Sequence, residues 1–435
     1  MPETLRPAAA LAALLFLAAP VRAQPPPGAA APAVTLAEAI ARALEVQPAM
    51  VQARGAVSNA AWQSRAAYGA FLPSLSVSSS AYRVNTPSVT NGLPTQAGSY
   101  QYNSGLSASV DLFDGFRRIA GARGAAAAGE ASGAGLVSQR YQVTLQTQQL
   151  FYTALANDEL MRVAVAQLRR AREEREIAVN KFMAGAATRA DTLTATVGLG
   201  NARLALLQAQ ANLATAQATL ARQIGREGEV RALPDTVMPA PVDTAGLRAA
   251  ALAGAPSVRA AESASRAASA SLWQTRAQFW PALSLSYSAS SQGGTAPWDG
   301  FESGNRNLNQ LRFGLSWTLF NGFSREQAVA QSGASRDLAR AQAEDARRQV
   351  DAQLTQQVAA MRTAYEQIAI SAENVDAASE ALRVQQDRYR LGAGTLLDLL
   401  TAESNFIQAQ VSHVQARYNY LDARAQLEAI VGRTL

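Results

Sequence analysis

The chain repeats one set of four short landmarks about 207 residues apart. The first copy reads Phe71-Leu72-Pro73-Ser74-Leu75-Ser76, Leu112-Phe113-Asp114-Gly115-Phe116, Gly185-Ala186-Ala187-Thr188 followed by Asp191, and Ile224-Gly225-Arg226. The second copy reads Phe279-Trp280-Pro281-Ala282-Leu283-Ser284, Leu319-Phe320-Asn321-Gly322-Phe323, Gly392-Ala393-Gly394-Thr395 followed by Asp398, and Val431-Gly432-Arg433. The order and nearly the spacing are kept over a period far longer than that of a solenoid, so the sequence predicts a tandem duplication of one long unit. We place repeat 1 at 34–225, a proline-containing linker at 226–247 and repeat 2 at 248–435.

The first residues are typical of a secretory signal peptide, over 1–23. Arg6 precedes an apolar run over 8–19, and Val21-Arg22-Ala23 fits a small-residue cleavage site. A transmembrane anchor is the alternative, but the run is shorter than the roughly 20 residues that span a bilayer, and Pro20 ends it. We therefore expect an exported chain that begins with a flexible lead-in, rich in Pro and Ala, over 24–33.

Composition excludes several classes of protein. There is no cysteine, so neither a disulfide nor a lipid anchor on an N-terminal cysteine can form. One histidine, His413, leaves no metal-ligand spacing, and we interpret it as a packed or surface helix residue. No catalytic constellation and no phosphate-binding glycine loop are visible, so we expect neither an enzyme nor a cofactor. The net charge of +6 comes from scattered arginines and predicts solvated helix faces, the charged run over 169–176 among them, rather than a nucleic-acid site.

Two alternating segments in each repeat predict β-strands, over about 71–82 and 100–114 in repeat 1 and about 279–290 and 309–320 in repeat 2. The clearest alternation puts five apolar residues on one strand face: Leu311, Phe313, Leu315, Trp317 and Leu319. A length of about 10 residues suits a tilted transmembrane strand, and we expect this face to meet lipid. The segments between the strands, 83–98 and 291–307, are expected to be exposed loops.

Four strands in one chain cannot close a barrel, and an open sheet edge cannot lie in lipid. If the strands span a membrane, several chains must therefore share one barrel. The alternative is a soluble four-stranded sheet that packs on helices of its own chain.

The remainder of each repeat predicts a long antiparallel helical hairpin. Proline is absent from 116–225 and from 323–432, and apolar residues recur every three to five positions. Glycines turn the chain near 185 in the first hairpin and near 392 in the second. The helix over 116–183 would reach on the order of 100 Å.

These features resemble the TolC-like outer-membrane efflux proteins over nearly the whole mature chain. The resemblance rests on the duplication, the two Leu-Phe-(Asp/Asn)-Gly-Phe strand ends, the glycine-centred tips and, most specifically, Ala416-Arg417-Tyr418-Asn419-Tyr420-Leu421 before Val431-Gly432-Arg433. It implies a mainly α-helical fold with a small transmembrane β part: a homotrimer whose twelve strands close one barrel, continuous with a periplasmic tunnel of coiled-coil helices. It further implies a passive exit duct of a tripartite efflux or type I secretion system. The partners would be a periplasmic adaptor protein and an inner-membrane transporter; the residues do not choose between small-molecule and protein cargo.

The resemblance also places a gate at the hairpin tips. Asp398 falls where the family has acidic residues that line the narrow periplasmic entrance, so three copies would form a negative ring that favours cations. Tyr389 matches a tip residue that helps to hold the entrance closed. Thr401 stands where a second acidic ring residue can occur, and Gly394 stands where an arginine can bridge to an acidic residue, here Asp191. We therefore expect the closed state to rely on fewer or different polar links.

A purely structural role is open for the same residues. Thr188 with Asp191, and Thr395 with Asp398, are spaced as capping boxes that start the return helices. The resemblance additionally makes the tips the surface that meets the adaptor, through Gly185, Thr188, Gly392, Gly394 and Thr395.

The main rival function is that of a periplasmic coiled-coil scaffold or adaptor that never enters a membrane. Such a protein would cover the apolar stripe over 311–319 with its own helices, whereas a duct would leave it exposed.

Overall fold

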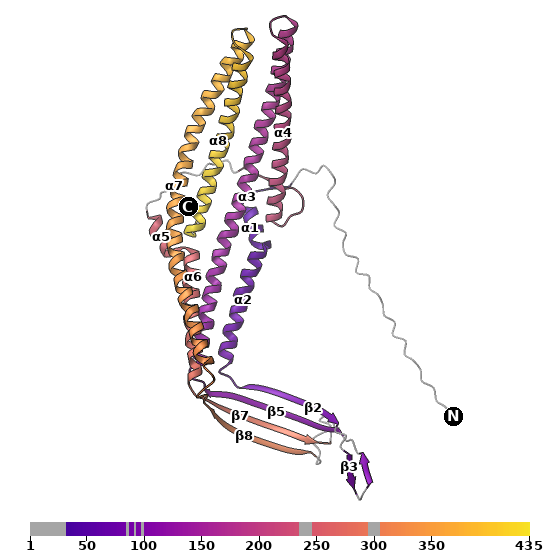
Figure 1. The fold of residues 1–435 in the computed structure, drawn as a ribbon, viewed down its shortest axis with the longest axis vertical. Helices are drawn as coiled ribbons and strands as arrows, with labels where there is room; N and C mark the ends of the chain where they lie inside the picture. Colours follow the sequence, from indigo (N-terminus) through magenta and orange to yellow (C-terminus); the bar gives the residue numbers. More distant parts are fainter. Residues whose placement is uncertain (1–31, 84–86, 91–92, 97–99, 235–245, 295–304) are drawn as a thin grey trace, which may run out of the picture.

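The computed structural model describes residues 32–83, 87–90, 93–96, 100–234, 246–294 and 305–435 (Figure 1). Repeat 1 consists of α1 (Leu36–Val46), α2 (Pro48–Gly69), β2 (Ser74–Arg83), β3 (Pro87–Thr90), β4 (Leu93–Gln96), β5 (Tyr100–Phe113), α3 (Arg117–Met183) and α4 (Arg189–Gln223). Repeat 2 consists of α5 (Leu247–Gly254), α6 (Pro256–Arg276), the 3₁₀ turn η1 (Ala277–Phe279), β7 (Ala282–Gly293), β8 (Arg306–Ser316), α7 (Ser324–Arg390) and α8 (Leu396–Val431). The six main elements of each repeat follow the same order, so the internal repetition of the sequence is also a repetition of structure.

The lead-in is ordered at its C-terminal end, contrary to the expectation of a flexible segment through residue 33. Ala33 belongs to β1 (Ala33–Val34), which pairs in parallel with β6 (Arg231–Ala232) in the linker between the repeats. The signal peptide expected over 1–23 lies outside the described residues and stays a prediction.

The long helices form two antiparallel hairpins that run side by side (Figure 1). α3 packs on α4 and α7 packs on α8, and α3 also packs along α6 and α8, so the hairpins are joined to each other. α3 and α7 each contain 67 residues, and each is about 100 Å long at 1.5 Å per residue. The tips lie at one end of the molecule and the sheet lies at the other (Figure 1).

Two apolar cores lie where the short helices pack on the long ones. The first includes Val34, Phe151, Leu220 and Ile224, and therefore combines β1 with α3 and the end of α4. The second includes Leu247, Val258, Leu354, Tyr420 and Leu427, and combines α5 and α6 with α7 and α8. The short helices of repeat 1 thus pack on α3, whereas α6 of repeat 2 packs on α3 as well as on α7.

Strands β2, β5, β7 and β8 form one antiparallel sheet in that order. β2 pairs with β5 and β7 pairs with β8, as predicted, and β5 pairs with β7 to join the repeats. Residues directly opposite each other on paired strands share one side of a sheet. The register therefore gathers an apolar set on one side: Leu75, Val77, Leu106, Ala108, Val110, Leu283, Leu285, Tyr287, Leu311, Phe313 and Leu315. It gathers serines on the other side: Ser74, Ser76, Ser107, Ser109, Ser284, Ser286 and Ser288.

The predicted strand over 309–320 is wrong at both ends, because β8 starts three residues earlier and ends four residues earlier. Trp317 and Leu319 consequently lie beyond the strand. The Trp317 indole Nε1 donates to the carbonyl of Phe279 at 3.1 Å. The Arg325 guanidinium donates to the carbonyls of Thr318 at 2.5 Å and Leu319 at 2.9 Å. These contacts satisfy backbone groups that a longer strand would offer to a neighbouring strand.

The other strand ends shift by up to three residues. β2 and β7 begin at 74 and 282 rather than at 71 and 279, because Pro73 and Pro281 have no N–H to donate to a ladder. The loop expected over 83–98 contains the β3–β4 hairpin, and the loop expected over 291–307 is shortened by the ends of β7 and β8.

Replacing Gly225 with alanine should destabilise the fold more than the same change at Gly228. Both glycines have a positive φ, 68° and 83°, so both variants carry a backbone strain of about 1–2 kcal/mol. A Cβ at Gly225 would lie 2.8 Å from Cγ2 of Val46, whereas a Cβ at Gly228 would meet nothing within 4 Å. We expect the clash to add about 1–3 kcal/mol, seen as a lower melting temperature by circular dichroism. Equal losses in the two variants would contradict this packing of α1 on the end of α4.

Candidate functional site

Each hairpin tip is a glycine turn. Gly185 and Gly392 have φ of 75° and 77°, a left-handed conformation that favours glycine. In both tips the N–H of the next residue donates, at 2.8 Å, to the carbonyl five residues earlier. The last carbonyls of α3 and α7 are thereby satisfied, and the chain can reverse within a few residues.

The capping boxes predicted at both tips are confirmed. Thr188 Oγ1 accepts from the N–H of Asp191 at 3.2 Å, and Asp191 Oδ2 accepts from the N–H of Thr188 at 2.9 Å. The corresponding distances between Thr395 and Asp398 are 3.1 Å and 3.3 Å. Both return helices therefore start from the same reciprocal pair of bonds.

One of the two capping aspartates, Asp398, lines a groove between α7 and α8. Asp398 and Thr401 lie together in a groove of about 700 Å³ between α7 and α8, whose other polar lining is Ser371, Asn374, Gln385, Asn405, Gln408 and Ser412. Hydrogen bonds from the side chain and backbone of Thr395 lower the pKa of Asp398, so its carboxylate stays ionised. Asp191 is not part of this lining. Asp398 is thus an exposed negative charge in a polar groove close to the tip.

Lys181 and Tyr389 link the two hairpins near their tips. Lys181 Nζ donates to the backbone carbonyl of Tyr389 and lies 4.0 Å from the centroid of its ring. The Tyr389 side chain is buried, which raises the pKa of its hydroxyl, and that oxygen has no hydrogen-bond partner among the described residues. Tyr389 therefore joins the hairpins through its carbonyl and ring face.

Lys181 was not among the site residues predicted from the sequence, although the composition of the chain singles it out. It is the only lysine among the 39 basic residues of the chain. A lysine ammonium is a compact charge with three rotatable donors, so it can donate to the Tyr389 carbonyl while it lies over the ring of the same residue.

A buried cluster of Arg170, Glu174 and Glu403 joins α3 to α8 farther from the tips. Arg170 Nε lies 3.3 Å from Glu403 Oε1, and Glu174 and Glu403 are only 6% and 7% exposed. Burial, the charge of Glu403 and a hydrogen bond with Glu403 together raise the pKa of Glu174 to about 8. The expectation that 169–176 is a solvated face is therefore wrong at Glu174, because α8 covers this side of α3.

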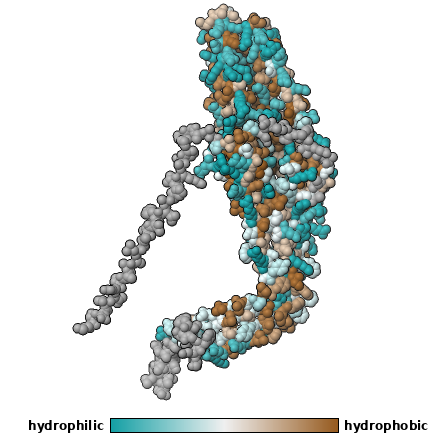
Figure 2. All heavy atoms as spheres, turned by 180° about the vertical axis from the view of Figure 1, so that it is seen from behind, coloured by the Kyte–Doolittle hydropathy of each residue, from teal (hydrophilic) through white to brown (hydrophobic). Residues whose placement is uncertain are grey.

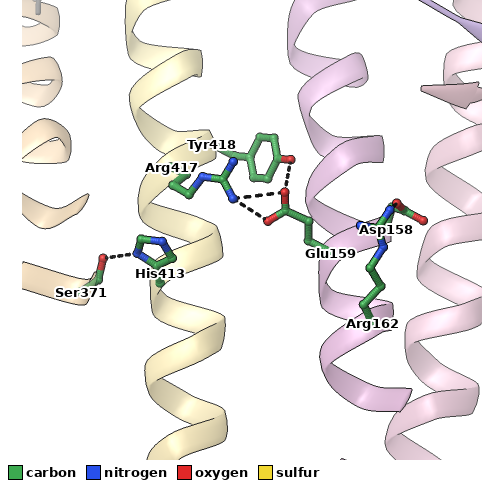
Figure 3. Close-up of polar contacts among 7 residues, drawn as sticks. All are labelled: Asp158, Glu159, Arg162, Ser371, His413, Arg417 and Tyr418. Atoms are coloured by element: carbon green, nitrogen blue, oxygen red, sulfur yellow. Dashed lines mark hydrogen bonds and ion pairs between the residues drawn. The ribbon is translucent and has the colours of Figure 1, made fainter. Parts of the chain in front are cut away.

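A third contact, farther from the tips again, is built from the stretch that carries the family resemblance (Figure 3). Arg417 Nη1 donates to both carboxylate oxygens of Glu159, at 3.2 Å and 3.0 Å, and the Tyr418 hydroxyl donates to Oε1 at 2.9 Å. His413 Nδ1 lies 3.0 Å from the Ser371 hydroxyl, so the histidine bridges α8 to α7 (Figure 3).

The three contacts follow one line along α3. Glu159, Arg170 and Lys181 are each eleven residues apart, and eleven residues make about three helical turns, so the three side chains lie on one face. With these three residues, the half of α3 that lies nearer the tip contacts the second hairpin.

No helix in the part of the chain that the structure describes is long and apolar enough to cross a membrane. No group of three His, Asp or Glu side chains there could hold a metal ion.

Glu174→Gln should remove a pH dependence of stability. Between the ordinary glutamate pKa of 4.5 and about 8, the folded chain retains a proton that the unfolded chain releases. Stability therefore falls as the pH rises through this window, and the variant lacks that fall. Thermal unfolding in detergent at about pH 5 and pH 9 should show the variant gaining stability relative to the parent at the higher pH. Glu176→Gln, at an exposed position on the same helix, is the control. Parallel behaviour of all three proteins would contradict a protonated Glu174.

A family model described as outer membrane efflux protein matches residues 39–226 and 247–433, one match in each repeat. The outer membrane efflux protein BepC of Brucella suis is 26% identical over 390 residues, which cover 82% of this chain and 79% of the relative. Protein CyaE of Bordetella pertussis is 28% identical over 407 residues, which cover 90% of this chain and 82% of the relative.

Solved structures show the same fold. The outer membrane protein VceC of Vibrio cholerae has a TM-score of 0.77 at 19% identity, over 92% of this chain and 96% of that chain. The MtrE outer membrane channel of Neisseria gonorrhoeae, in its open state, has a TM-score of 0.76 at 22% identity, over 92% and 89%. The mainly helical fold expected from the sequence is therefore confirmed. Because the family model matches most of both repeats, the chain belongs to the outer membrane efflux protein family.

Proposed function

We propose that this chain is one of three identical subunits of a passive exit duct in the outer membrane, the last part of a tripartite efflux or type I secretion system. The duct receives small molecules or proteins from an inner-membrane transporter, through a periplasmic adaptor protein, and catalyses no reaction. The observation that carries the proposal is the four-stranded sheet, with an uncovered apolar side opposite a serine-rich side.

The apolar side of the sheet is suited to lipid. Leu75 and Val77 are 70% and 78% exposed, and Leu311, Phe313 and Leu315 are 60%, 67% and 74% exposed. Large contiguous apolar surfaces of this kind are rare on soluble proteins. A periplasmic scaffold would bury this stripe under its own helices, so the exposure favours the duct. Trp317 and Leu319, beyond the end of β8, are 59% and 72% exposed and extend the same lipid-facing surface.

The edges of the sheet support the sharing of one barrel among subunits. β2 and β8 are the outer strands, with ten and eleven residues, and each has a partner on one side only. Unpaired backbone groups are not tolerated in lipid. Pairing β8 of one copy with β2 of the next, three times over, gives a closed barrel of twelve strands with the serines facing the water-filled interior.

The helical part supports a tunnel across the periplasm. Helices of about 100 Å continue from the sheet and end in the two tips (Figure 1). The tips, with Gly185, Thr188, Gly392, Gly394 and Thr395, are the surface proposed to meet the adaptor. The relative TtgC of Pseudomonas putida, 27% identical over 189 residues, is described as a probable efflux pump outer membrane protein, which favours a pump as the partner.

The proposed gate combines a contact between the two hairpins with a ring of negative charge. Lys181 and Tyr389 hold the first hairpin against the second, in place of the arginine bridge that Gly394 cannot make to Asp191. Asp398, repeated three times around the axis, supplies the negative ring, with Thr401 as an uncharged second layer.

Lys181→Gln should make the duct open more readily. The change removes the ammonium that bonds the Tyr389 carbonyl and covers its ring, so the hairpins separate at lower cost. In planar lipid bilayers we expect a higher mean conductance than that of the parent protein. Arg189→Gln is the matched control, because it removes an exposed cation from the same tip. Equal conductance of the two variants would exclude this link from the gate, and no conductance of the parent in any bilayer would refute the duct itself.

Asp398→Asn should weaken selection for cations. The reversal potential in a KCl gradient should move toward zero, because the negative ring loses its charge. Asp191→Asn disturbs an equivalent capping box without changing the groove between α7 and α8, so it should leave the reversal potential unchanged. Because the pKa of Asp398 is lowered, the parent should keep its selectivity down to the ordinary aspartate pKa of 3.8. Loss of selectivity well above that pH would contradict the assignment.

A further inference from the structure

A groove of about 760 Å³ lies between α3 and α6, where the helices meet the sheet. Its lining is mostly apolar and includes Phe116, Ile119, Trp273 and Trp280, together with two arginines, Arg123 and Arg276. The three aromatic side chains are 58–66% exposed. None of these residues belongs to the tips or to the hairpin contacts described above.

The groove continues the apolar side of the sheet. Phe113 is paired with Leu283 and therefore lies on that side. The ring of Phe116 contacts Phe113 edge-on with centroids 5.4 Å apart, and it contacts Trp280 in the same manner at 6.5 Å. Figure 2 shows apolar side chains gathered at the junction of helices and sheet. An apolar chain that lay along the sheet could therefore extend into the groove without crossing a polar strip.

The two arginines are cations without an acidic partner. Arg123 lies about two turns beyond Phe116 on α3, and Arg276 lies one turn before Trp280. Both are exposed, and neither forms an ion pair within the described part of the chain; Arg276 instead rests against Trp273, with 5.7 Å from its guanidinium carbon to the ring centroid. Arginines nearby do pair: Arg118 lies 3.3 Å from Asp114.

The duplication does not account for this pair of charges. The residue 207 positions after Arg123 is Ala330, and the residue 208 positions before Arg276 is Tyr68. The two equivalent positions in the other repeat therefore lack a cation, although Arg65 stands at the position equivalent to Trp273 and Phe116 has an aromatic counterpart in Phe323.

We propose that this groove binds one glycerophospholipid of the periplasmic leaflet. The phosphate lies between Arg123 and Arg276, since guanidinium groups bind phosphate through directed pairs of hydrogen bonds. An acyl chain lies across Phe116 and Trp280 and continues along the apolar side of the sheet. Aromatic rings at the boundary between hydrocarbon and headgroups and arginines just beyond them match the order of layers in a bilayer. The inference rests on the proposed function, because the leaflet reaches this level only if the sheet spans the membrane.

The test is native mass spectrometry of the detergent-extracted full-length protein, delipidated and then titrated with phosphatidylglycerol. We expect one tightly bound lipid per chain. The double variant Arg123→Gln/Arg276→Gln should bind at least about tenfold more weakly, because two charge-assisted contacts are lost. Arg203→Gln, which removes an exposed arginine of α4, is the control and should bind as the parent does. The subunit number of each variant, read from the same spectra, verifies its assembly.

Two outcomes would overturn the proposal. If the assembled parent takes up no phosphatidylglycerol, or the double variant takes up as much as the parent, the groove is not a lipid site; a neighbouring copy that covers it would give this result. If the parent proves soluble without detergent, the proposed function fails and this inference fails with it. Assembly in detergent with unchanged lipid binding, by contrast, leaves the duct in place and removes the lipid site alone.

Discussion

The unpaired edges of the β2-β5-β7-β8 sheet are the constraint on which the rest of the structure depends. In lipid every backbone N–H and C=O needs a partner inside the protein, and this chain supplies partners to only one side of β2 and β8. No segment in the described part of the chain covers the apolar side of the sheet, where Val77 is 78% and Leu315 74% exposed. If identical copies continue the sheet, the edges of β2 and β8 are paired, and if lipid contacts the apolar side, that side is removed from water. The serine-rich side then faces an aqueous interior without any change in the register.

The helical part meets a different requirement in the proposed duct, because α3 and α7 are about 100 Å long and the two hairpins must hold together and still be able to separate at their tips. Apolar cores join the short helices to the hairpins near the middle of the molecule, around Phe151 and Tyr420. Toward the tips, polar contacts at Glu159, Arg170 and Lys181 join the hairpins. A smaller apolar cluster, which includes Tyr389 and Leu399 and is contacted by Ile177 of α3, lies beside the last of them. The bond from Lys181 to the Tyr389 carbonyl can be exchanged for water, which places one polar link that can open at the end where the gate is proposed.

The sequence was sufficient to predict the order of strands and helices, because these elements leave regular patterns that extend over many residues. Alternation predicted the four strands, and the absence of proline predicted the long hairpins. The sequence was insufficient where the contacts of a single side chain determine a strand end, the burial of a charge or a link between helices. The strand ends at Ser316 because Arg325 donates hydrogen bonds to the carbonyls of Thr318 and Leu319. That segment has the alternation of apolar and polar residues that is typical of a strand, so the sequence pattern alone does not show the end. Glu174 appeared to belong to a solvated charged run, because the cover from α8 comes from more than 200 residues away. The capping aspartates were recognisable from spacing, whereas the link through Lys181 depends on a carbonyl and a ring face that no spacing reveals.

The shared barrel is tested most directly by the mass of the detergent-extracted outer-membrane protein, measured by light scattering with the detergent contribution subtracted. Each chain has a mass of 45.8 kDa before any processing. A shared barrel predicts a mass of three chains, because three sheets are needed to pair every edge in one barrel of twelve strands. A stable monomer would leave β2 and β8 with open edges, and it would contradict the shared barrel and the exit duct built on it.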